Sequence, residues 1–142
     1  MRSKSPLALM EQVVMVLVFA LAAALCLRVF VFSDQASGRN EAVDRAVLEA
    51  QNAAETIKSA GDIGGLKETM GAQIDDQAVL AVYYDEEWKP ASVETAAYRL
   101  LVKETDADVS GLRTAEITVD DGTGENVLFS IPVAWQEVSG NE

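Results

Sequence analysis

The sequence predicts an α+β protein in which one long N-terminal helix, transmembrane and then amphipathic, packs on a small antiparallel sheet of about four strands. Three observations predict this fold class. An uninterrupted apolar run covers residues 13–27 and resumes at residues 29–32 after Arg28. Alanine and valine then recur at helical spacing as far as Ala60. From residue 78 onward, short segments alternate between apolar and polar residues and are separated by turn residues, which is typical of half-buried strands.

The apolar run is long enough to cross a lipid bilayer. Twenty helical residues at about 1.5 Å each span about 30 Å, the thickness of the hydrocarbon core. We therefore predict a transmembrane helix over residues 7–32, after a short cytoplasmic leader of residues 1–6. A cleaved secretory signal is the alternative, with the alanines at 22–24 as its cleavage site. Because the chain stays apolar for several residues after them, retention as an anchor is the preferred interpretation.

Charge is distributed unevenly around this helix. The leader contains Arg2 and Lys4 and no acidic residue, whereas the chain from Ser33 onward has 8 basic and 22 acidic residues, a net charge of −14. Positive charge that flanks a spanning helix stays in the cytoplasm. The prediction is a single-pass protein of the cell membrane with a cytoplasmic N-terminus and an extracytoplasmic C-terminal domain. Arg28, near the outer end of the run, is expected to snorkel and flank the membrane there, with an interhelical ion pair as the alternative.

Composition argues against several kinds of function. The net negative charge of the outer domain argues against binding to nucleic-acid phosphates, which requires an excess of Lys and Arg. The chain has no His, and its one Cys, Cys26, lies inside the apolar run, so the usual zinc ligands and the commonest general base are missing. We expect a non-enzymatic protein with no cofactor and no metal. Asp120, Asp121 and Glu125 are interpreted as a solvated hairpin turn, with a calcium site as the weaker alternative.

An amphipathic helix is predicted after the membrane segment, with room for a bend at residues 33–40. Its apolar stripe is mostly alanine, which permits close approach to a neighbouring element. Gly61 follows where a helix-ending residue is expected, and a short second helix follows between Asp62 and Ala72, closed by Gly71. Residues 33–72 thus form a helical region. The predicted stripe comprises Val43, Ala46, Val47, Ala50, Ala53, Ala54, Ile57 and Ala60.

Residues 73–142 are predicted to form an extracytoplasmic antiparallel β domain. Residues 120–124, Asp-Asp-Gly-Thr-Gly, are a strong hairpin signal. Pro132 indicates that the last strand is an edge strand or contains a bulge. Short connections favour a meander, and the alanine-rich helix is the only candidate cover for its apolar face. The expected strands are 78–84, 97–104, 112–119 and 126–136, with 88–90 as a short edge piece.

Four aromatic residues lie in or beside these strands. Aromatic side chains on strands usually belong to the core, and an exposed recognition patch is the alternative interpretation. The residues are Tyr83, Tyr84, Trp88 and Trp135.

The start of the membrane segment carries a lone acidic residue in the sequence Lys4-Ser5-Pro6-Leu7-Ala8-Leu9-Met10-Glu11. A basic leader, an apolar helix with this Glu, an amphipathic continuation and a C-terminal sheet resemble the type IV pilins and type II secretion pseudopilins. In that family a Gly precedes the cleavage point and a Glu is fifth in the mature chain. The resemblance implies Leu7 as the first mature residue and places Pro6 where the family has Gly.

The resemblance implies a structural subunit of an extracytoplasmic pilus, or of a secretion or DNA-uptake pseudopilus. Its partners would be other pilin-like subunits and an assembly platform in the membrane. Leu7 and Glu11 are the implied assembly residues, because in the family this Glu pairs with the N-terminal amine of an adjacent subunit and sets the register of the helices. With Pro6, cleavage and methylation of the leader stay open.

Two alternatives stay open beside this interpretation. Glu11 can instead lie at the headgroup level, with the span beginning at Val13. The chain can also be a single-pass, membrane-tethered binding or regulatory module whose outer domain contacts a partner and does not polymerise.

Overall fold

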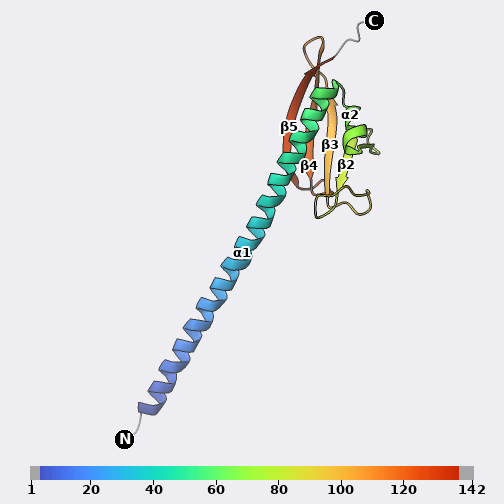
Figure 1. Ribbon diagram of the computed structural model, residues 1–142. Helices are drawn as coiled ribbons and strands as arrows, with labels where there is room; N and C mark the ends of the chain where they lie inside the picture. Colours follow the sequence, from blue (N-terminus) through green and yellow to red (C-terminus); the bar gives the residue numbers. More distant parts are fainter. Residues whose placement is uncertain (1–3, 138–142) are drawn as a thin grey trace. The chain divides into compact units, whose positions relative to one another are not determined.

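The computed structural model describes residues 4–137 and has the predicted α+β architecture (Figure 1). The elements follow the order α1, α2, β1, β2, β3, β4, β5. The chain divides into two compact units, an N-terminal unit of residues 1–41 and a C-terminal unit of residues 42–142. One helix, α1, passes from the first unit into the second, and the whole sheet belongs to the second.

Helix α1 (Lys4–Ala60) ends at the glycine that the sequence marks as its terminator. Gly61 has a φ of 70° and donates its N–H to the carbonyl of Ile57 at 2.8 Å, the left-handed cap in which glycine carries no Cβ penalty. The backbone stays helical across residues 33–40, so the segment that left room for a bend does not interrupt the helix.

The second half of α1 contributes the predicted alanine stripe to the core of the C-terminal unit. Ala46, Ala50, Ala53 and Ile57 are fully buried, and their steps of four, three and four residues keep them on one helix face. Ala60, which was expected to continue the stripe, is exposed in the last turn. The stripe is therefore confirmed over its central part, and it packs with the sheet residues in one cluster.

Helix α2 (Gly65–Met70) lies within the predicted range of 62–72. It buries Leu66, and it ends at Gly71, whose φ of 68° is again left-handed. This confirms both the short second helix and its terminator.

The sheet is an antiparallel meander, as predicted, with the strand order equal to the chain order. It has five strands where about four were expected. The additional strand, β1, has two residues. The expected edge piece at 88–90 is reduced to a single bridge between Tyr84 and Pro90. The strands are β1 (Gln73–Ile74), β2 (Leu80–Tyr84), β3 (Tyr98–Thr105), β4 (Leu112–Asp120) and β5 (Val127–Gln136).

One face of the sheet is apolar and supplies the other half of the core. Leu100 on β3 lies opposite Val119 on β4, and Val102 lies opposite Ile117; all four are fully or almost fully buried. β5 forms an edge of the sheet, and Pro132 lies within it opposite Glu116. The irregularity in the β4–β5 ladder is at Val119/Asp120, so Pro132 marks an edge strand and not a bulge.

Candidate functional site: the apolar helix and the groove of the C-terminal unit

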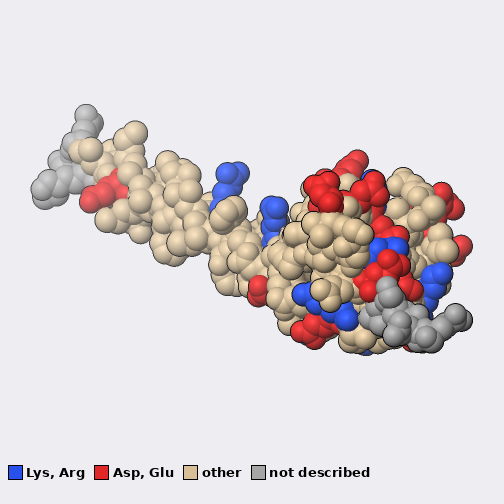
Figure 2. Space-filling model, turned by 90° about the horizontal axis from the view of Figure 1, so that it is seen from above, with Lys and Arg blue, Asp and Glu red and all other residues tan. Residues whose placement is uncertain are grey.

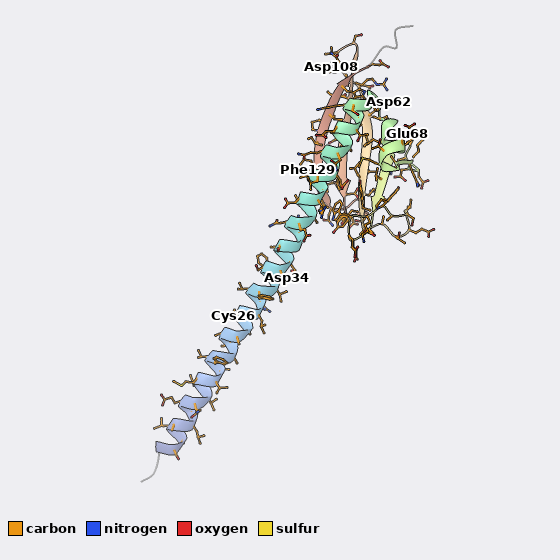
Figure 3. All side chains as sticks on the ribbon, in the orientation of Figure 1. Cys26, Asp34, Asp62, Glu68, Asp108 and Phe129 are labelled. Carbon is orange, nitrogen blue, oxygen red and sulfur yellow. The ribbon has the colours of Figure 1, made fainter. Side chains whose placement is uncertain are left out.

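The N-terminal part of α1 leaves its large apolar side chains uncovered. Leu7 is 67% exposed, Phe19 76% and Phe32 73%, and Cys26 is also exposed on this segment (Figure 3). Within the part of the chain that the structure describes, this one helix is long and apolar enough to span a membrane, as judged by length and composition. The segment therefore presents an apolar surface that this chain does not bury itself.

The structure places the expected assembly residues on one turn of this helix. Leu7 and Glu11 are four residues apart, and residues at that spacing lie on the same helix face. Both are exposed, and among the described residues no ion pair includes Glu11. Any partner of this carboxylate therefore has to come from a region that the structure does not describe, from lipid or from another molecule.

Three residues were expected to flank the membrane: Arg2 and Lys4 before the apolar segment, and Arg28 near its C-terminal end. Arg2 lies outside the described residues, and Lys4 is the first residue of α1. Arg28 is exposed and contributes to a shallow apolar hollow with Leu27, Val31 and Phe32. Its aliphatic stem thus has apolar neighbours along the helix, which is the arrangement that allows a charged head to reach an interface.

The C-terminal unit has a groove of about 880 Å³ that sequence analysis did not anticipate. Three parts of the unit line it: one side of α1, the end of α2, and β2 with the turn that follows it. We call it the Trp88 groove. Its side chains include Glu49, Asn52, Glu55 and Ser59 from α1, together with Tyr84 and Trp88.

A hydrogen bond joins two walls of the Trp88 groove. The phenol of Tyr84 donates to Oε2 of Glu49 at 3.0 Å. Burial of the ring, with the neighbouring Glu49 carboxylate, raises the pKa of Tyr84 above its ordinary value, because both disfavour the phenolate. Tyr84 is therefore a neutral donor that holds Glu49 in place.

The ring of Trp88 is held by other aromatic residues. It stacks on Tyr98 with a centroid distance of 4.1 Å and an interplanar angle of 11°, and Tyr84 lies 5.7 Å away in a tilted arrangement. Trp88 has a φ of 62°. The backbone N–H of Trp88 donates to the carbonyl of Asp85 at 3.0 Å. The Asp85 carboxylate accepts the backbone N–H of Lys89 at 3.0 Å. The turn therefore fixes both the backbone and the ring.

The prediction that the aromatic residues belong to the core is confirmed for Tyr84 and Trp135, which are each 5% exposed. Tyr83 is buried as well, but its neighbours in the strand place it on the opposite face of the sheet. Trp88 is only half-buried and lines the groove, because it lies in a turn and not on a strand. It also packs against the core cluster, so it lies at the margin of the core and contributes to the groove wall.

The face of the sheet that points away from the core cluster carries a partly buried ion pair between Arg99 and Asp120. Nη2 of Arg99 on β3 donates to Oδ2 of Asp120 on β4 at 2.9 Å, and Oδ1 of Asp120 accepts the N–H of Gly122 at 2.8 Å. The hydrogen bond that Arg99 donates to the Asp120 carboxylate is the main cause of the raised pKa of Arg99. Asp75, from the β1–β2 turn, lies 3.9 Å from Nη1 of Arg99, so one guanidinium links two turns of the sheet.

Asp121 organises the turn between β4 and β5. Its Oδ1 accepts the hydroxyl of Thr123 at 2.6 Å, and its Oδ2 accepts the amide of Asn126 at 2.7 Å. These hydrogen bonds lower the pKa of Asp121 to about 2. Two of the three carboxylates weighed as calcium ligands, Asp120 and Asp121, are thus engaged within the protein, and no group of residues suited to a metal ion is found among residues 4–137.

Figure 2 shows acidic side chains in several separate groups on the visible face of the C-terminal unit, in keeping with its excess of Asp and Glu. Comparison with known proteins found no matching family model, no matching curated protein and no matching solved structure. The function is therefore inferred from the residues of this chain.

Proposed function

We propose that this chain is a single-pass, pilin-like structural subunit of an extracytoplasmic pilus, or of a secretion or DNA-uptake pseudopilus. The observation that supports the proposal is the uncovered apolar surface of α1 between Leu7 and Phe32. Keeping one Val, Leu or Phe side chain in water instead of burying it costs about 1.5–3 kcal/mol. More than a dozen such side chains are exposed here, so lipid or other helices have to cover the segment.

The same surface suits both storage in a membrane and assembly. In lipid there is little hydrophobic force between helices, because the lipid tails are as apolar as leucine. When such a helix leaves the bilayer, only packing among other helices can keep its side chains away from water. Assembly is then favoured by burial of the apolar helix, and the subunit stays monomeric while it remains in lipid.

Glu11 gives this packing a register. A carboxylate near the end of a membrane helix costs up to about 3 kcal/mol at depth and less at the interface, so an intermolecular cation would offset a real penalty. The pilin resemblance names that cation as the N-terminal amine of a neighbouring subunit. The topology that goes with the proposal places Arg2 and Lys4 in the cytoplasm and the acidic unit outside.

The test is a Glu11→Ala variant of the full-length chain, expressed in its own cell beside a Gln12→Ala control at the adjacent position. Assembled material is sheared from the cells and compared with the amount of subunit in the membrane. Loss of a pairing worth at least about 1.4 kcal/mol lowers incorporation of Glu11→Ala about tenfold or more, while its membrane level matches the control. Normal incorporation of Glu11→Ala contradicts the proposed mechanism.

A second candidate function is favoured by one residue. Pro6 stands where the pilin pattern has Gly, and an unprocessed leader suits a membrane-tethered binding or regulatory module that does not polymerise. Mass spectrometry of the mature N-terminus separates the two. A methylated chain that starts at Leu7 supports the subunit, and an intact Met1 favours the tether.

A further inference from the structure

We propose that the Trp88 groove binds a cationic peptide segment of a partner protein, with a Lys or Arg side chain against Trp88 and between Glu49 and Glu55. The inference goes beyond the proposed function, because the groove belongs entirely to the C-terminal unit. It holds equally for an assembled subunit and for a monomeric tether.

The charge of the lining selects the occupant. Among residues 4–137, Glu49 and Glu55 line the groove, and no Lys or Arg does. Both carboxylates come from the same side of α1, where Asn52 and Ser59 also line the groove. The unit around them carries a large excess of negative charge. An anionic or strongly apolar occupant would leave these carboxylates desolvated without a partner, which is costly, whereas a cation pairs with them.

The aromatic wall adds a second feature that suits a cation. Lys and Arg are attracted to the face of an indole ring. Tyr98 stacks on one face of Trp88, and Trp88 also contributes to the groove wall. Tyr84 holds Glu49 through one carboxylate oxygen, so the other oxygen is available to an incoming donor. The ring and the carboxylate are therefore both positioned before the occupant arrives, which lowers the entropic cost of binding.

The dimensions of the groove fit a short extended peptide. Its α1 wall runs from Glu49 to Ser59, a distance of about 15 Å at about 1.5 Å per helical residue. An extended chain covers that length in about four or five residues. Asn52 and Ser59 place an amide and a hydroxyl along the wall, where they can hydrogen-bond to the backbone of the peptide.

The test uses the full-length chain, labelled with ¹⁵N, in non-ionic detergent micelles at pH 7 and physiological salt. The probe is acetyl-tetralysine amide, with acetyl-tetraglutamate amide as its control. The chain has two Trp residues, so their indole N–H signals report separately on the groove and on the core. We expect the Trp88 signal to shift and saturate with the lysine peptide alone, while the signal of Trp135, which is 5% exposed, does not move.

Two charge-matched variants separate the groove from general attraction to an acidic surface. Glu55→Gln removes one charge from the groove and is expected to weaken binding of the lysine peptide about two- to fivefold, the range for one exposed ion pair. Glu125→Gln removes one charge from the exposed β4–β5 turn and is expected to leave the affinity unchanged. Glu55 is exposed and its side chain makes no hydrogen bond within residues 4–137, so the variant folds as the parent does.

Three results overturn the inference. The first is a Trp88 signal that does not respond at peptide concentrations of several millimolar. The second is an equal loss of affinity in Glu55→Gln and Glu125→Gln, which would show diffuse charge attraction. The third is a Trp88 signal that changes with protein concentration and without peptide, because a second copy of the chain would then be the occupant.

Discussion

Replacement of Ile57 by alanine tests whether the second half of α1 is part of the folded C-terminal unit. Ile57 is fully buried in the cluster that joins α1 to the sheet. The substitution removes three buried carbons, which amounts to about 2.5 kcal/mol of transfer free energy at about 0.8 kcal/mol each. The cavity left behind adds to this loss, so we expect the free energy of unfolding to fall by about 3–4 kcal/mol.

Leu48 supplies the matched control on the same helix. It is 50% exposed, so Leu48→Ala is expected to cost less than about 1 kcal/mol. The assay is urea unfolding of the full-length chain in non-ionic micelles, followed by tryptophan emission, because Trp135 is buried in the same cluster. Ile57→Val, which is expected to cost about 0.5–1.5 kcal/mol, provides a milder step if Ile57→Ala leaves too little folded protein.

Two results would contradict this packing: equal losses of unfolding free energy in Ile57→Ala and Leu48→Ala, or a loss below about 1 kcal/mol in Ile57→Ala. Either result would mean that residues 42–60 do not pack on the sheet. The unit would then need another cover for its apolar face.

Two further predictions concern the sheet and its turns, and the same urea assay measures both. Asp120→Asn leaves Arg99 with only the more distant Asp75 as a charged partner and is expected to lower the unfolding free energy by about 2 kcal/mol; a loss below about 0.5 kcal/mol would contradict a structural role for the ion pair. Ala78 has a φ of 60°, where a Cβ is unfavourable, so Ala78→Gly is expected to stabilise the protein by about 0.5–1 kcal/mol. Destabilisation by Ala78→Gly would contradict the left-handed turn.

The sequence was most informative where one periodic pattern was long. The alanine stripe predicted which face of α1 is buried, because four positions at three- and four-residue steps leave only one face to choose. Glycines marked both helix ends correctly, since Gly61 and Gly71 each adopt the positive φ that other residues avoid.

Features that involve few residues could not be predicted from the sequence. β1 has two residues, too few for an alternating pattern to be recognised. The position of Trp88 could not be predicted, because a bulky residue with a positive φ contradicts the usual preference. Arg99 and Asp120 are neighbours only through the register of β3 and β4.

Of the candidate sites, the one formed by neighbouring residues could be predicted from the sequence, and the one formed by distant segments could not. Leu7 and Glu11 are adjacent on one helix turn, so the sequence alone places them together. The Trp88 groove combines residues from α1, α2 and the turn after β2, and no local pattern joins segments so far apart in the chain. The partner of Glu11 belongs to another molecule in the proposal, so a single chain cannot contain it.

The proline in β5 has a consequence for how crowded copies behave. β5 is a ten-residue edge strand, and an open edge of that length is a template for runaway sheet-to-sheet aggregation. Pro132 has no N–H, and a proline in an edge strand normally turns its nitrogen to the unpaired side. A neighbour that tried to extend the ladder would meet a missing donor midway. Copies at high local density can therefore collide edge to edge with a reduced tendency to fuse into a fibril.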